Sequence, residues 1–361
     1  MMKDRGLKSA LLSYFVHNGW YPQLEVDVKT NDGASKIDKF ITDIDVLALV
    51  PSVNGVLVPL LGDCKTLRNQ SPSNRVLWMR GLMEYWSAER GIIILDKSIE
   101  PDHKQFADKL GVTLLSSDDF SRYSKSMRVG IDDKQYSVSD IEIWESYFES
   151  LLKYPQISSV VKFVKFGFWN EDSAAKRLRA LLYEVRTIKN ELNPSNYIHL
   201  ALLCDLVSLF AVSINGIVMQ MFNRYTFSDN KDAFVAELKM VIWGGHDNYR
   251  FLNEIRAKYS TNESELSLPE WDRFIYLIRN CLESPRSTMY SPLLIKELAF
   301  VVLGRRTIDI QEIGNSQLYV GTTDPYAIKS SALYVEYFCK ACKLPPEFLD
   351  CIVSSLLRIG R

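Results

Sequence analysis

Asp63 and Lys65 lie two residues apart at the end of an apolar run that predicts a β-strand. Because side chains alternate along a strand, both leave the same face, and Cys64 points the other way, into the core. A second acid, Asp45, lies in the preceding apolar run. Burying such charges unpaired is costly, so the group needs a partner or a ligand. An acidic centre of this kind would need a cation to bridge it to a phosphate group.

The turn between the two apolar runs decides whether the acids can act together. If Asn54-Gly55 forms a two-residue turn, Asp45 faces Cys64, on the wrong side of the sheet. A three-residue loop with Gly55 in the left-handed conformation instead pairs Ser52 with Val56 and places Asp45 opposite Asp63. A bulge near Pro59 or Gly62 would also shift the register. We favour the register that brings the acids together, although the turn signal alone does not decide it.

The elements around these residues alternate between helical and strand patterns. Leu24, Val26 and Val28 alternate with polar residues, as in a half-buried strand, whereas the apolar residues of the run 91–96 do not alternate with polar ones, which is typical of a strand covered on both faces. The pattern predicts a mixed sheet flanked by helices. The expected helices are 6–18, 73–89 and 101–110, and the expected strands are 20–29, 40–50, 56–65, 91–96 and 112–117.

Taken together, these residues and elements resemble the PD-(D/E)xK (restriction-endonuclease-like) nuclease superfamily over residues 6–120. The pattern is similar to that of archaeal Holliday-junction resolvases and Mrr-type enzymes: Asp45 matches the first acid, Asp63 the second and Lys65 the lysine. Glu25 matches an auxiliary acid on the first strand more weakly. Mrr-type members often carry a glutamate in the first helix, and residues 6–18 contain none.

The resemblance implies a metal-dependent endonuclease that hydrolyses the phosphodiester bonds of DNA, with RNA as the less favoured substrate. Asp45 and Asp63, the backbone carbonyl of Cys64 and, more weakly, Glu25 would bind Mg²⁺ or Mn²⁺, which prefer hard oxygen ligands. The metal would activate a bound water. Lys65 would orient that water or stabilise the transition state.

Basic residues near this constellation are candidates for contacts with DNA. Arg68, Arg75 and Arg80 follow the motif, and guanidinium groups match phosphate geometry. Lys8, in the first predicted helix, is a weaker candidate of the same kind. The alternative for the arginines, a solvated helix face, is about equally favoured by the pattern.

The remainder of the chain predicts a helical domain. We place the nuclease-like domain at residues 1–128 and an all-α domain at 129–361, which would contact the substrate, a protein partner or a second copy of the chain. The apolar stretch 198–222 is long enough to span a bilayer, but Asp205 and other polar residues interrupt it, so we expect a buried central helix and no membrane. The other expected helices are 171–192, 230–243, 269–282, 292–303, 326–342 and 346–358.

Composition narrows the functional classes. The chain has 361 residues with a net charge of −1, so any affinity for nucleic acid must come from a local patch. Its six scattered cysteines and a start without a signal-peptide pattern indicate a cytoplasmic protein. The sequence lacks a glycine-rich phosphate loop, so ATP hydrolysis is not indicated. The competing hypothesis is a non-catalytic module that binds DNA or protein, in which Lys65 pairs structurally with Asp45 and Asp63.

Overall fold

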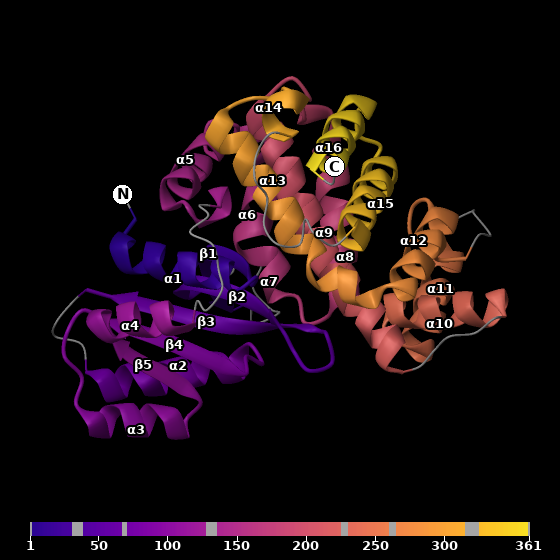
Figure 1. Ribbon diagram of the computed structural model, residues 1–361. Helices are drawn as coiled ribbons and strands as arrows, with labels where there is room; N and C mark the ends of the chain where they lie inside the picture. Colours follow the sequence, from indigo (N-terminus) through magenta and orange to yellow (C-terminus); the bar gives the residue numbers. More distant parts are fainter. Residues whose placement is uncertain are drawn as a thin grey trace. The chain divides into compact units, whose positions relative to one another are not determined.

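The structure is a computed structural model that describes residues 2–30, 39–66, 71–127, 136–224, 230–259, 265–314 and 325–359. Contacts divide it into two compact units. The first comprises Met1–Ser52 and Leu57–Lys153, and the second comprises Val53–Val56 and Tyr154–Arg361. Figure 1 shows strands only in the first unit. The expected fold class is confirmed: a mixed sheet flanked by helices precedes a region in which every described element is helical.

The first unit is built on a five-stranded sheet in the order β1-β2-β3-β4-β5. The first three strands form an antiparallel meander, and β3, β4 and β5 run parallel. Helices make the two parallel crossovers, as such connections require. The elements are α1 (Arg5–His17), β1 (Tyr21–Thr30), β2 (Lys39–Pro51), β3 (Leu57–Lys65), α2 (Pro72–Tyr85), β4 (Arg90–Leu95), α3 (Pro101–Lys109), β5 (Val112–Ser116), α4 (Ser117–Met127), the 3₁₀ turn η1 (Ser137–Ser139) and α5 (Ile141–Leu151).

The β2–β3 connection adopts the register that brings the acids together. Pro51 pairs with Leu57, and Val46 pairs with Gly62. The same register, continued by one residue, places Asp45 opposite Asp63. Gly55 has a φ of 76°, in the left-handed region that glycine enters without a Cβ penalty. The register expected from the three-residue loop is therefore correct, and the register of the two-residue turn is wrong.

Helices α1 and α2 cover opposite faces of the sheet. A Cβ on Gly62 would meet Leu11 of α1, whereas a Cβ on Gly91 would meet Met79 of α2. Gly91 pairs with Leu61, the neighbour of Gly62, so the two glycines face opposite ways. Both glycines let a helix approach the strands closely, and the site residues on β2 and β3 are held between two packed layers.

The second unit is a helical bundle around α9 (Tyr197–Asn223). Helix α9 is long and apolar enough to cross a membrane, with a mean hydropathy of 2.0 in its most apolar stretch, but 94% of that stretch is buried inside the protein. The expected buried central helix is confirmed, and its burial is compatible with a soluble protein. The remaining helices are α6 (Ser158–Lys162), α7 (Phe168–Asn170), α8 (Ala174–Thr187), α10 (Lys231–Trp243), α11 (His246–Tyr259), α12 (Trp271–Glu283), α13 (Ser291–Arg305), α14 (Ile310–Gly314), α15 (Pro325–Cys342) and α16 (Pro346–Ile359), with short 3₁₀ or π turns at Pro155–Ile157, Phe163–Gly167, Lys189–Glu191 and Pro285–Met289.

An ion pair explains the charge that interrupts α9. The carboxylate of Asp205 lies 2.8 Å from the Nζ of Lys296 on α13, and both side chains are buried. Such a pair avoids leaving either charge unpaired in the core. The acid therefore has a partner within the bundle.

The compact first unit extends further than residues 1–128. Helix α5 belongs to it, and Arg5 at the start of α1 pairs with Glu142 at 2.9 Å and with Glu145 at 3.1 Å. Trp144 of α5 is fully buried and donates a hydrogen bond to the carbonyl of Val138. A helical pattern along the chain does not show with which unit a helix packs, so the sequence alone placed α5 in the helical region.

Candidate active site

Asp45 is the centre of a buried network of ion pairs. Its Oδ2 accepts hydrogen bonds from the backbone N–H of Cys64 at 2.8 Å and from the Nζ of Lys65 at 2.9 Å. Its Oδ1 lies 2.8 Å from the Nζ of Lys8 on α1. The Asp45 side chain is 2% exposed. Each of its oxygens therefore has a cation beside it.

Asp63 completes the arrangement on the adjacent strand. Its Oδ1 lies 3.3 Å from the Nζ of Lys65, which is 20% exposed and stands between the two acids. The guanidinium of Arg75 on α2 binds both oxygens of Asp63, a bidentate geometry suited to a carboxylate. Asp45, Asp63 and Lys65 thus converge at the end of β3. The two acids are buried and paired with basic side chains, and Lys65 is the most exposed of the three residues.

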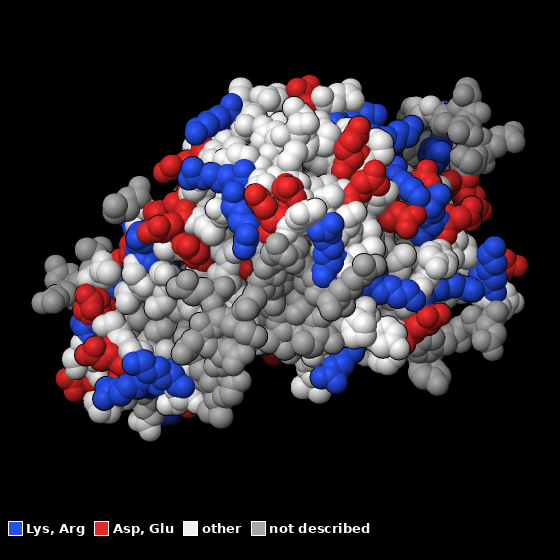
Figure 2. Space-filling view, turned by 45° about the horizontal axis from the view of Figure 1, so that its top comes forward, with Lys and Arg blue, Asp and Glu red and all other residues white. Residues whose placement is uncertain are grey.

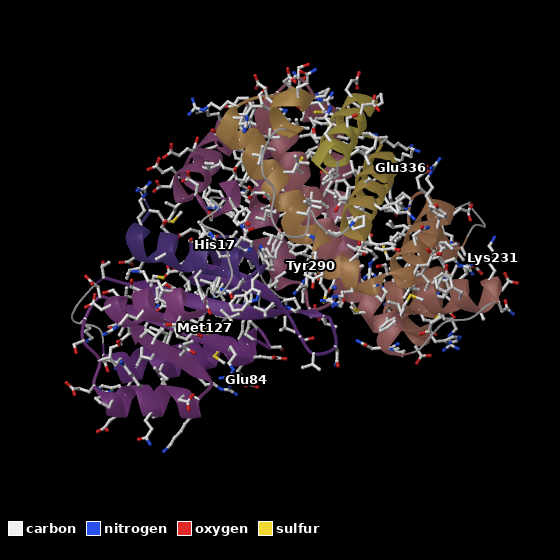
Figure 3. All side chains as sticks on the ribbon, viewed as in Figure 1. His17, Glu84, Met127, Lys231, Tyr290 and Glu336 are labelled. Carbon is white, nitrogen blue, oxygen red and sulfur yellow. The ribbon has the colours of Figure 1, made fainter. Side chains whose placement is uncertain are left out.

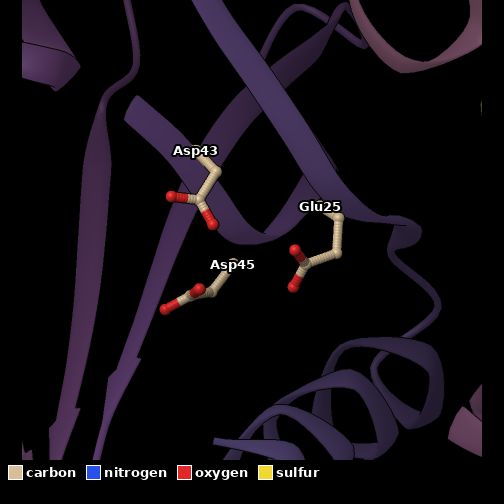
Figure 4. A group of neighbouring side chains, drawn as sticks. All are labelled: Glu25, Asp43 and Asp45. Carbon is tan, nitrogen blue, oxygen red and sulfur yellow. The ribbon is translucent and has the colours of Figure 1, made fainter. Parts of the chain in front are cut away.

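A carboxylate triad of Glu25, Asp43 and Asp45 lies beside this pair of acids. One oxygen from each lies within 4.8 Å of the other two. Figure 4 shows the three side chains near one another. Asp43 and Asp45 share a strand face because they are two residues apart on β2. Asp43 was not among the site residues expected from the sequence, although its spacing from Asp45 could have indicated it.

Glu25 reaches the triad from an unusual backbone conformation. It lies within β1, between the pairs Leu24–Val46 and Val26–Ile44, so it stands across from Asp45. Its φ of 53° is in the left-handed region, which costs a residue with a Cβ about 1 kcal/mol. Strained residues of this kind cluster at functional sites. The conformation directs the Glu25 side chain to Lys8, with which it forms an ion pair.

The charged groups of this network shift one another's pKa values. Burial acts to raise the pKa of Asp45, but the ammonium groups of Lys65 and Lys8 outweigh it and hold that pKa below its usual value. Burial raises the pKa of Asp63 despite Arg75 and Lys65, and it raises the pKa of Glu25 despite Lys8. The pKa of Lys65 lies above its usual value because Asp63 and Asp45 outweigh its burial. Lys65 therefore carries its charge at neutral pH.

Two basic residues expected at the DNA surface lie inside this network. Lys8 is 2% exposed and paired with Asp45 and Glu25, so its position does not offer its charge to a phosphate. Arg75 is committed to Asp63, and its guanidinium carbon lies 3.6 Å from the ring centroid of Trp78. The buried acids hold these two cations in the interior of the protein. The order of the residues along the chain does not show that the acids and the cations meet.

Of the other two basic residues that were expected to contact DNA, the structure describes only Arg80. Arg80 is 45% exposed and forms an ion pair with Glu84, one turn later on α2, at 3.2 Å. Figure 3 labels Glu84 at the end of this helix. Arg68 lies outside the described residues. On the face seen in Figure 2, basic and acidic side chains are interspersed, in keeping with a net charge of −1.

The donor set fits a hard divalent cation. Carboxylate oxygens are the ligands that Mg²⁺ and Mn²⁺ prefer, and the triad places three of them close enough to share one ion. Cys64 directs its N–H toward Asp45, and its carbonyl leaves the strand on the same side. The Cys64 thiol is buried, and burial raises its pKa.

Comparison with known proteins does not show a family for this chain. No protein-family model matches the chain, and neither the curated proteins nor the solved structures contain a significant match. The resemblance to the PD-(D/E)xK nucleases therefore rests on the motif and its place in the fold.

Proposed function

We propose that this protein is a metal-dependent nuclease of the PD-(D/E)xK type that hydrolyses phosphodiester bonds in DNA. One observation carries the proposal: Lys65 stands between the oxygens of Asp45 and Asp63, at 2.9 and 3.3 Å, where a meander meets the parallel strands. Two acids and a lysine in this arrangement combine cation binding with a positive group at the reacting phosphate.

Asp45, Asp63 and the Cys64 carbonyl would hold Mg²⁺ or Mn²⁺, together with Asp43 and Glu25 from the triad. When bound, the ion supplies an activated water and neutralises charge on the phosphate. Lys65 is charged, partly exposed and fixed by both acids. It orients the attacking water or stabilises the charge that develops on the phosphate oxygens. Arg75 positions Asp63 through its bidentate contact.

Residues and elements outside the site bind the substrate or a partner in the proposed function. The exposed Arg80 contacts the DNA backbone, and Arg68 follows the catalytic lysine closely in sequence. The helical unit selects the substrate, binds a protein partner or forms a homodimer. The six cysteines of the sequence are free wherever the structure describes them, as expected for a cytoplasmic protein.

A second candidate function is a non-catalytic module that binds DNA or protein. The observation favouring it is the charge balance: Glu25, Asp45 and Asp63 are matched by Lys8, Lys65 and Arg75. A cluster satisfied in this way holds together without a metal ion. The two functions differ in whether the site turns over a nucleic acid.

A panel of nucleic acids distinguishes these two functions. The full chain is incubated with Mn²⁺ and with double-stranded, single-stranded and branched DNA, and with RNA of the same sequence. We expect cleavage of at least one DNA form at a rate well above that of RNA, and loss of cleavage in Lys65→Ala. Binding without cleavage of any member, at any Mn²⁺ concentration, would favour the non-catalytic module.

A further inference from the structure

The ammonium group of Lys8 occupies the carboxylate triad like a bound cation. It contacts Glu25 and the Oδ1 of Asp45, two of the three acids that lie close enough to share an ion. Its side chain is 2% exposed, although lysine is almost never buried to that extent unless it is paired. A positive charge therefore already lies where the site's chemistry calls for one.

The bonds of Asp45 show what an incoming ion would have to replace. Oδ2 accepts from the Cys64 N–H and from Lys65, whereas Lys8 is the only described partner of Oδ1. The Cys64 N–H is part of the backbone and cannot move aside. A divalent ion that binds Oδ1 of Asp45 therefore competes with Lys8 for that oxygen.

Helix α1 holds the backbone of Lys8 in place. Asp4, just before the helix, accepts a hydrogen bond from the N–H of Thr66 at 2.8 Å, directly after Lys65. Further along α1, Leu11 packs against Gly62. With both sides fixed, only the flexible side chain of Lys8 can leave Asp45, and Glu25 can keep it.

We infer that Lys8 is a tethered counter-cation that a divalent metal ion displaces from Asp45, so that it sets the metal affinity of the site. This inference rests on the proposed function for its metal site. Lys8 stabilises the acids when the ion is absent and opposes the ion when it binds, because two cations cannot share the same oxygen without repulsion. Lys8 consequently keeps the carboxylates of Asp45 and Glu25 paired in the metal-free state.

The test is a calorimetric titration of the full chain with Mn²⁺ alone, without nucleic acid. Lys8→Met keeps the length and apolar stem of the side chain but removes the charge, and Lys8→Gln also keeps a donor for Asp45. Lys3→Met, at an exposed lysine before α1, is the control. We expect both Lys8 variants to bind Mn²⁺ more tightly than wild type, on the order of tenfold or more, and to melt at a lower temperature without metal. The control should match wild type in both measurements.

A purely structural role predicts the opposite sign for affinity. If Lys8 only keeps the acids in place, its loss spreads them apart, and Mn²⁺ binding weakens or stays unchanged. Suppose that wild type binds Mn²⁺ and cleaves DNA, but the Lys8 variants bind Mn²⁺ no more tightly than wild type. This outcome would overturn the inference and leave the proposed function intact. Tighter binding by the variants without DNA cleavage by any protein would support the inference and contradict the nuclease. Absence of Mn²⁺ binding by wild type and both variants would overturn both.

Discussion

Asp45→Asn should destabilise the protein by about 3 kcal/mol without metal and abolish binding of Mn²⁺. Asparagine keeps the shape of the side chain but removes the anion that pairs with Lys8 and Lys65. Removing one partner of a buried ion pair leaves an uncompensated charge, which typically costs 3–5 kcal/mol. Urea denaturation measures the first effect, and a Mn²⁺ titration measures the second.

The effect of Asp45→Asn should depend on pH in a defined direction. The folded-state pKa of Asp45 lies below its unfolded value, so the carboxylate stabilises the fold fully above the unfolded pKa of about 4. That contribution is lost as the pH falls through the folded-state pKa, so the gap between wild type and variant should narrow in acid. Asp108→Asn, at an exposed position, is the control and should show no gap. A gap that is constant with pH would contradict the ionised state of Asp45.

Lys65→Ala should reduce the rate of DNA cleavage by about 10²–10³-fold, the usual effect of removing one group that stabilises a transition state. Mn²⁺ binding should not weaken, because the variant loses a positive charge beside the acids and keeps both carboxylates. The measurement is single-turnover cleavage at saturating Mn²⁺, next to a Mn²⁺ titration.

The control for Lys65 is Lys125→Ala, at an exposed lysine of α4. Its cleavage rate and Mn²⁺ affinity should equal those of wild type. If Lys65→Ala cleaves DNA at the wild-type rate, Lys65 has no catalytic role. If it instead loses Mn²⁺ binding, Lys65 serves to hold the acids in position.

The fold of the first unit could be predicted from its local patterns. The alternation in β1 and the apolar runs of β2 and β4 are consequences of which faces are buried. The register of β2 and β3 was one of two that the Asn54-Gly55 signal allowed, because both turns accept a left-handed glycine, and the strand pairing shows which one forms. Helix ends were less predictable: α2 stops at Tyr85, before the expected residue 89, and Ser87 has a φ of 52°.

The partners of the site residues could not be predicted in the same way. The sequence shows that Asp45 and Asp63 need cations, but Lys8 is distant in the chain, and packing of α1 brings it to the sheet. Arg75 was interpreted as a phosphate contact because it follows the motif, and the fold places it on Asp63. The pairing of Arg5 with α5 has the same origin. Such pairs arise from tertiary packing, which a linear pattern does not encode.

The rate of DNA cleavage by the wild-type chain as a function of free Mn²⁺ concentration tests the central claim most directly. The proposed mechanism predicts no cleavage in excess EDTA, a rate that rises with Mn²⁺ and saturates, and recovery when Mn²⁺ is added back after chelation. Half of the maximal rate should fall at the Mn²⁺ concentration that half-saturates the site in calorimetry. Cleavage that continues unchanged in excess EDTA would contradict metal-dependent hydrolysis at Asp45, Asp63 and Lys65.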